Sequence, residues 1–251
     1  MAKATIPVQL KTKTLQRFDA YIRDAETEME RTIEGDRFLW SDSNVGRAKA
    51  VGSGKVIAEF WTGSNPMKAP NGLIHDWIGA EFIPGVTVED VLALIQDYDN
   101  HTNVYKPEVV ASKLIKRQGN SFQLYLRLRK QKIITVILDT DHNAEYRCIN
   151  RMRWVCRSYT TRVAEVEEAG SPQERVMPPD TGHGFLWRLN SYWRFQQGES
   201  GVCVECRAIS LTRDVPFGMG WLIEPIIQRL PKESLINTLE ATRRALQIGQ
   251  K

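Results

Sequence analysis

Long apolar runs are absent from this sequence, and none approaches the roughly 18 residues that cross a bilayer as a helix. The first residues, 1–8, also lack the apolar stretch of a secretory signal. A chain from which such a signal had been removed would look the same. We therefore expect a soluble protein, either cytoplasmic or, if a signal has been cleaved, periplasmic.

A strong excess of either charge is also missing. The 251 residues include 34 basic and 30 acidic ones, which gives a net charge of +4. This balance is too mild for a nucleic-acid partner, which usually requires a concentrated basic stripe. A chain that is 42% hydrophobic and 25% charged also has enough apolar residues to fold, which argues against extensive disorder.

Cysteines are too few for a disulfide framework in a chain of this size. Two of them have a C-x-x-C spacing that raises the alternative of redox chemistry or a metal site. They lie in a strand-like run, however, where residues three apart point to opposite faces. We expect the thiols of this pair, Cys203 and Cys206, to be buried and free, and we expect no disulfide between any two of the four cysteines, which also include Cys148 and Cys156.

Recognised catalytic and metal-binding motifs are missing as well. The sequence contains no H-E-x-x-H, no nucleophile elbow, no Walker A loop and no dinucleotide glycine fingerprint. We therefore expect no cofactor, no metal and no catalytic residue of these types. The polar residues around His101 (Asp97, Asp99, Asn100) are predicted to form a solvated turn. The alternative is a role at the mouth of a pocket, because a histidine near acids can titrate near neutral pH.

The patterns that are present predict an α+β protein. Apolar residues at three- and four-residue intervals predict a helix over 12–33, and Thr87 followed by Asp90 predicts a helix cap. A meander of antiparallel strands is predicted from its short polar links. The last helix is expected to begin at Pro231 and to cover the concave face of the sheet. The strands are predicted near 108–117, 120–129, 132–140, 145–167, 184–197 and 201–213.

Alternation assigns the faces of these strands. Four arginines at 147–157 cannot enter a core without partners, so they should face water and their neighbours should face the last helix. Pairing residue 197 with 202 places Arg194 opposite Glu205 on the outer, water-facing side, which also carries Arg207, and places Trp193 opposite Cys206 on the inner side. In 120–129 the leucines should point inward, unless the N-terminal helix covers this strand and puts Arg127 in the pocket.

The inward faces combine aromatic rings with a few polar groups, which is typical of a small-molecule site. A filled core would give the same pattern, so both interpretations remain open. The ligand-binding candidates are Asn150, Met152, Trp154, Cys156, Trp187, Leu189, Ser191, Trp193, Phe195, Trp221, Leu235 and Leu239.

Residues 74–92, 184–195 (GFLWRLNSYWRF), 201–216 (GVCVECRAISLTRDVP) and 231–240 (PKESLINTLE) resemble the START-related superfamily, also known as the helix-grip or SRPBCC proteins. The resemblance implies a curved antiparallel sheet wrapped around a long C-terminal helix, with an N-terminal helical extension. It divides a single structural domain into an N-terminal part, 1–70, and a helix-grip core, 71–251.

The resemblance also implies a function. Its members hold lipids, sterols or polyketide-like molecules between the sheet and the helix. We expect binding or transfer of such a hydrophobic molecule, with transient membrane contact as a further interaction. The alternative is a cyclase or dehydratase acting on a hydrophobic substrate in the same cavity. Few titratable groups are assigned to the inward faces, which favours binding.

Overall fold

The computed structural model describes residues 7–33, 35, 37–61, 66–131, 135–214 and 220–248, without the side chains of 220–229. The helices and 3-10 turns within these residues are α1 (Thr12–Ile33), η1 (Ser41–Ser43), α2 (Val45–Gly52), α3 (Val88–Gln96), η2 (Tyr98–Asn100), α4 (His101–Val104) and α5 (Gly220–Ile248). The strands are β1 (Val8–Gln9), β2 (Ile57–Phe60), β3 (Met67–Ala69), β4 (Gly72–Pro84), β5 (Val109–Gln118), β6 (Ser121–Gln131), β7 (Thr135–Asn150), β8 (Arg153–Glu167), β9 (Arg175–Val176), β10 (Thr181–Gly182), β11 (Arg188–Gln197) and β12 (Gly201–Arg213).

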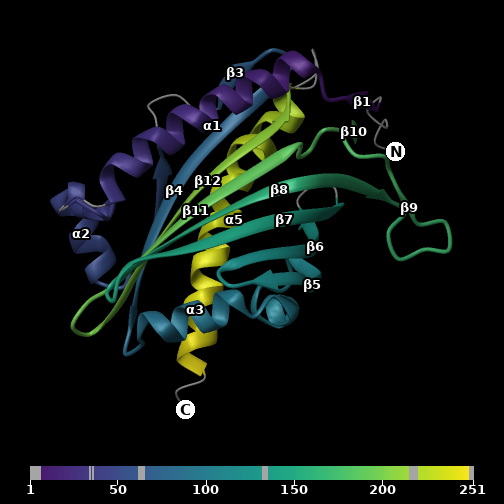
Figure 1. Ribbon diagram of the computed structural model, residues 1–251. Coiled ribbons are helices and arrows are strands. Elements are labelled where there is room, and N and C mark those ends of the chain that lie inside the picture. The colour runs from purple at the N-terminus through teal and green to yellow at the C-terminus, as the bar shows by residue number, and fades with distance from the viewer. Residues whose placement is uncertain are drawn as a thin grey trace.

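An antiparallel sheet dominates these elements. Its strands run in the order β2-β4-β12-β11-β8-β7-β6-β5, with β3 beside β4 and β9 beside β8. The predicted register of the β11–β12 hairpin is confirmed, because Gln197 pairs with Val202 and Trp193 pairs with Cys206. The sheet curves, with α1 across one face and α5 along the other (Figure 1). The predicted α+β architecture is therefore confirmed.

The concave face is covered by α5, which contacts β4, β12, β2 and α3. Leu235 and Leu239 are its buried contacts with the core. The prediction that this helix begins at Pro231 is wrong, since α5 begins at Gly220 and contains Pro231 in its interior. No helix in the described part of the chain has the length and hydropathy needed to cross a membrane.

Arg194, Glu205 and Arg207 were predicted to face water on the convex face. This prediction is wrong, because α1 and the segment after α1 cover that face. Phe18 and Ile22 of α1 pack on this face, and polar groups supply partners for its charges. Arg207 donates to Asp76 at 2.7 and 3.0 Å, and Glu205 accepts from the backbone of Trp40 and Ser41, both at 2.8 Å. The apolar partners of this buried sheet face thus come from α1, and the polar ones come from β4 and from the segment after α1.

Two local predictions have different outcomes. Thr87 and Asp90 form the predicted capping box at the start of α3. The predicted strand over 145–167 is wrong, because the chain reverses between β7 and β8 at 151–152. There the Asn150 side chain accepts a hydrogen bond from the Met152 backbone nitrogen at 2.9 Å, which stabilises the turn locally.

A buried carboxyl group lies on β4. Glu81 is fully buried, and neither of its side-chain oxygens has a hydrogen-bond partner within the described residues. The nearest cation is Arg243 of α5, whose Nε lies 3.9 Å from Glu81 Oε2. Burial raises the pKa of Glu81 from 4.5 to about 9, so this side chain is a neutral acid at pH 7.

The contact between α5 and β4 depends on Gly79. A Cβ atom at this position would lie 2.8 Å from Leu239 Cδ1 and 3.1 Å from the Ile57 carbonyl oxygen. We expect Gly79→Ala to lower the free energy of unfolding by about 1–3 kcal/mol, as overpacking does in other cores. Urea unfolding measures this. Gly52→Ala is the control, because a Cβ there meets nothing within 4 Å and should leave stability equal or higher. Equal losses in both variants would contradict the close contact.

Glu81 should make stability depend on pH. Between pH 4.5 and 9 the folded carboxyl keeps its proton while the unfolded one loses it. The free energy of unfolding should therefore fall as pH rises, by at most about 1.4 kcal/mol per pH unit. We expect Glu81→Gln to flatten this slope between pH 7 and 8.5, above the range in which histidines titrate. Parallel curves for the two proteins in urea unfolding would show that Glu81 is ionised in the folded state.

Candidate functional site

A row of small side chains crosses the inner face of the sheet. Ser158 of β8 pairs with Ser191 of β11, which pairs with Ala208 of β12. These residues leave space below α5, and a cavity of about 1280 Å³ lies between them and the helix. Its roof includes Leu235, Thr238 and Ala241 of α5. Small residues therefore open the cavity between elements that elsewhere pack closely.

Larger side chains bound this cavity at the side of α3. Trp193 lines it and stacks on Phe195, with the two ring centroids 6.2 Å apart. Phe195 belongs to the filled core, together with Val88 and Val91 of α3. The outer wall is apolar and comes from Leu124, Leu126 and Leu128 of β6. The inner face thus divides into a packed end and a hollow end.

Two buried histidines stand in the cavity wall. His101 begins α4 and His142 lies on β7, and their exposed fractions are 6% and 7%. Burial lowers the pKa of both imidazoles to about 4, and for His142 the neighbouring His101 contributes to the shift. Both rings are therefore neutral at pH 7. The predicted solvated turn is wrong for His101, and so is titration near neutral pH.

The tyrosines of the same wall are also un-ionised. Tyr98 and Tyr146 join their hydroxyls at 2.9 Å, and Tyr105 lies 3.2 Å from the Thr242 hydroxyl. Burial raises the pKa of Tyr105 to about 12, and it also raises the pKa values of Tyr98 and Tyr146. Within the residues that the structure describes, no group of His, Cys, Asp or Glu side chains is arranged to hold a metal ion.

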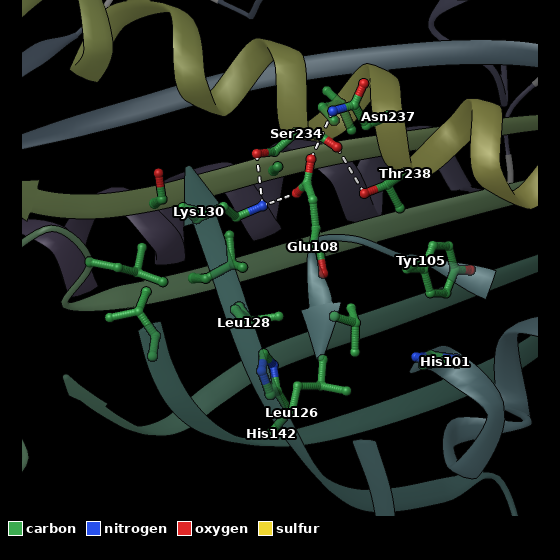
Figure 2. A pocket seen from close by; sticks show the side chains of 18 of the residues that line it. His101, Tyr105, Glu108, Leu126, Leu128, Lys130, His142, Ser234, Asn237 and Thr238 are labelled. Atoms are coloured by element: carbon green, nitrogen blue, oxygen red, sulfur yellow. Dashed lines mark hydrogen bonds and ion pairs between the residues drawn. The ribbon is translucent and has the colours of Figure 1, made fainter. Parts of the chain in front are cut away.

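A polar cluster joins the cavity roof to its outer wall (Figure 2). Glu108 directly precedes β5. Its carboxylate accepts a hydrogen bond from Lys130 of β6 and another from Asn237 of α5, the latter at 2.8 Å. Lys130 also donates to Ser234 of α5 at 2.8 Å. At the other side of the cavity, Glu165 accepts from the backbone and the Nδ1 atom of His183, at 2.7 and 2.8 Å. The Glu108 and Glu165 carboxylates at the cavity wall thus both accept hydrogen bonds from neighbouring groups.

The structure brings five of the predicted ligand-binding residues to the cavity. They are Cys156, Leu189, Ser191, Trp193 and Leu235. Four of them lie on β8 and β11, whose alternation in the sequence is uninterrupted at these positions. Leu235 is the contribution of α5 to the same space.

The other candidates lie elsewhere. Trp154, Phe195 and Leu239 pack in the filled core beside the cavity. Trp187 packs in the same hydrophobic cluster as Phe18 and Ile22 of α1. It precedes β11, so the alternation of side chains along that strand does not extend to it. Asn150 and Met152 line a shallow groove at the β7–β8 turn, far from the inward position predicted for a continuous strand. The side chain of Trp221 lies outside the described residues.

The sequence interpretation missed the wall formed by β7 and α4. A signal for β7 is visible, since its odd positions from 139 to 147 are Asp, Asp, Asn, Glu and Arg, whereas its even positions are neutral. The inward leucines of β6 are confirmed, and Arg127 points away from the cavity to Asp139 and Glu174. No comparable signal marks His101, because its burial depends on the fold of α4 over β5.

A solved structure shares this arrangement over most of the chain. An aromatase/cyclase, ZhuI from Streptomyces sp. R1128, matches over 71% of this chain and 96% of its own, with a TM-score of 0.50 and 9% identity. The chain has the START-like helix-grip fold. Two further structures with lower TM-scores of 0.47 match less closely. They are a STAR-related lipid transfer protein from Xanthomonas axonopodis (18% identity; 72% of this chain and 96% of that one) and human STARD10 (11%; 86% and 82%).

Sequence comparison gives no closer relationship. No protein-family model matches this chain, and no curated protein matches it. The helix-grip fold is thus evident from the structure, where sheet and helix enclose a cavity. The fold alone does not assign a ligand or a reaction.

The Glu108 cluster should stabilise the contact between α5 and β6 at the cavity. Glu108→Ala leaves Lys130 with the Ser234 hydroxyl and removes the partner of Asn237. We expect the free energy of unfolding to fall by about 1–3 kcal/mol, as for charge-assisted hydrogen bonds in partly buried sites. Urea unfolding measures the change. Glu59→Ala is the control, because its ion pair with Arg47 is more exposed and should contribute less than about 1 kcal/mol. A smaller loss at Glu108 than at Glu59 would contradict the bridging role.

Proposed function

We propose that this protein binds a hydrophobic small molecule in the cavity between the sheet and α5, as a carrier or binding module. The single observation that carries the proposal is the cavity itself, about 1280 Å³ in volume and walled largely by apolar side chains. Such a space holds a ligand of lipid, sterol or polyketide size. Burial of about 300 Å² of apolar ligand surface would contribute roughly 7 kcal/mol before the costs of association.

The titration behaviour of the wall favours binding over acid–base catalysis. Efficient general acids and bases have pKa values near the working pH. Burial instead moves the pKa of His101 and His142 down to about 4 and that of Tyr105 up to about 12. Each group is therefore held in its neutral form at pH 7. This pattern supports a wall that contacts a ligand without exchanging protons with it.

The proposal is tested with N-phenyl-1-naphthylamine, an apolar probe whose emission rises in a dry environment. We expect wild-type protein to bind it, and we expect Ser191→Phe, which fills the centre of the cavity floor, to bind at least tenfold more weakly. Ser53→Phe is the matched control, since Ser53 is exposed at the end of α2. Fluorescence titration gives the dissociation constants, and thermal melting verifies that each variant is folded. Equal binding by wild type and Ser191→Phe would place the probe outside the cavity and refute the proposal.

A further inference from the structure

In each of the two cavity histidines, a hydrogen bond determines which ring nitrogen carries the proton. His101 Nε2 lies 3.0 Å from the Ile95 carbonyl oxygen. A carbonyl oxygen only accepts, so this nitrogen carries the proton. Because the neutral imidazole has a single proton, Nδ1 of His101 is a bare acceptor.

The same tautomer follows for His142 by one further step. Its Nε2 lies 2.9 Å from the Thr140 hydroxyl, and that hydroxyl donates its only proton to the Leu126 carbonyl oxygen at 2.9 Å. The Thr140 oxygen must therefore accept from Nε2, which leaves Nδ1 of His142 as a second bare acceptor. Both rings line the cavity, on α4 and β7 (Figure 2).

No residue that the structure describes supplies a proton to either of these two nitrogens. Neither Nδ1 atom has a hydrogen-bond partner within the described part of the chain. Tyr105 donates to the Thr242 hydroxyl, since Thr242 gives its own proton to the Thr238 carbonyl oxygen. The Tyr98 and Tyr146 hydroxyls are paired with each other. This part of the wall therefore offers acceptors that a ligand can satisfy.

We propose that His101 and His142 select a hydrophobic ligand that carries a neutral hydroxyl group, whose proton is donated to a bare Nδ1 atom. This inference rests on the proposed function, since it assigns the ligand of the same cavity. An ionised carboxylate has no proton to donate and would place its charge beside two lone pairs. An ammonium group could donate, but burial of its charge in an apolar cavity is costly. A hydroxyl group satisfies the acceptor without a charge.

The proposal is tested by competition of three probes against N-phenyl-1-naphthylamine at pH 7.5. They are 1-dodecanol, its methyl ether 1-methoxydodecane, and dodecanoate. The ether matches the alcohol in its apolar chain but cannot donate. We expect wild-type protein to bind the alcohol about fivefold more tightly than the ether, the ratio given by one net hydrogen bond, and more tightly than the carboxylate.

The double variant His101→Gln/His142→Gln separates this role from packing. A glutamine amide can still donate from the position of Nε2, but it lacks the acceptor at Nδ1. We expect the preference for alcohol over ether to disappear while the binding of the naphthylamine probe persists. His75→Gln is the matched control, because His75 is also buried, its Nε2 also meets a threonine hydroxyl, and burial also lowers its pKa to about 4, but it does not line the cavity.

The outcomes are distinct. Failure of wild-type protein to bind the naphthylamine probe would overturn the proposed function and this inference with it. Normal probe binding with equal affinity for the alcohol and the ether would overturn the inference alone. Loss of the preference in His75→Gln to the same extent as in the double variant would also overturn it. If the double variant does not fold, the wild-type ratio of alcohol to ether still decides.

Discussion

The structure depends on how closely α5 approaches the sheet at different strands. At Gly79 of β4 the helix touches the backbone, because no side chain separates Leu235 and Leu239 from the strand. Towards β8 and β11 the same helix stands above Ser191 and its small neighbours, and the space between them remains hollow. One helix thus both completes a core and covers a cavity. The size of the side chains beneath it decides which of the two it does.

The convex face of the sheet is buried as well, and it carries charged side chains. Buried charges such as Arg207 and Glu205 would be costly if only apolar residues covered them. The chain before the sheet supplies what they need, through Tyr21, which donates to Asp76 at 2.5 Å, and through the backbone of Trp40 and Ser41. The N-terminal extension is therefore a structural partner of the sheet, and its removal would leave Glu205 without the backbone donors of Trp40 and Ser41.

Burial of the two histidines in the cavity wall bears on the proposed binding of a ligand there. The desolvation that lowers the pKa of His101 and His142 also fixes each imidazole as neutral, with one donor and one acceptor. The protein uses both donors in its own hydrogen bonds. Under the proposed function, a wall of this kind would distinguish ligands by whether they can donate a proton in a hydrogen bond, without a change of its own charge near neutral pH.

The sequence by itself determined the elements with strong local signals. The period of α1, the capping box at Thr87 and the β11–β12 register follow from side-chain spacing and short links, which act over a few residues. Only the tertiary structure decided which inward residues meet empty space. Trp193 and Phe195 share one face of one strand, yet the first lines the cavity and the second is enclosed under α3. That difference depends on elements distant in sequence, because a strand's own sequence does not specify which elements pack against it. The burial of His101 over β5 depends on distant elements in the same way.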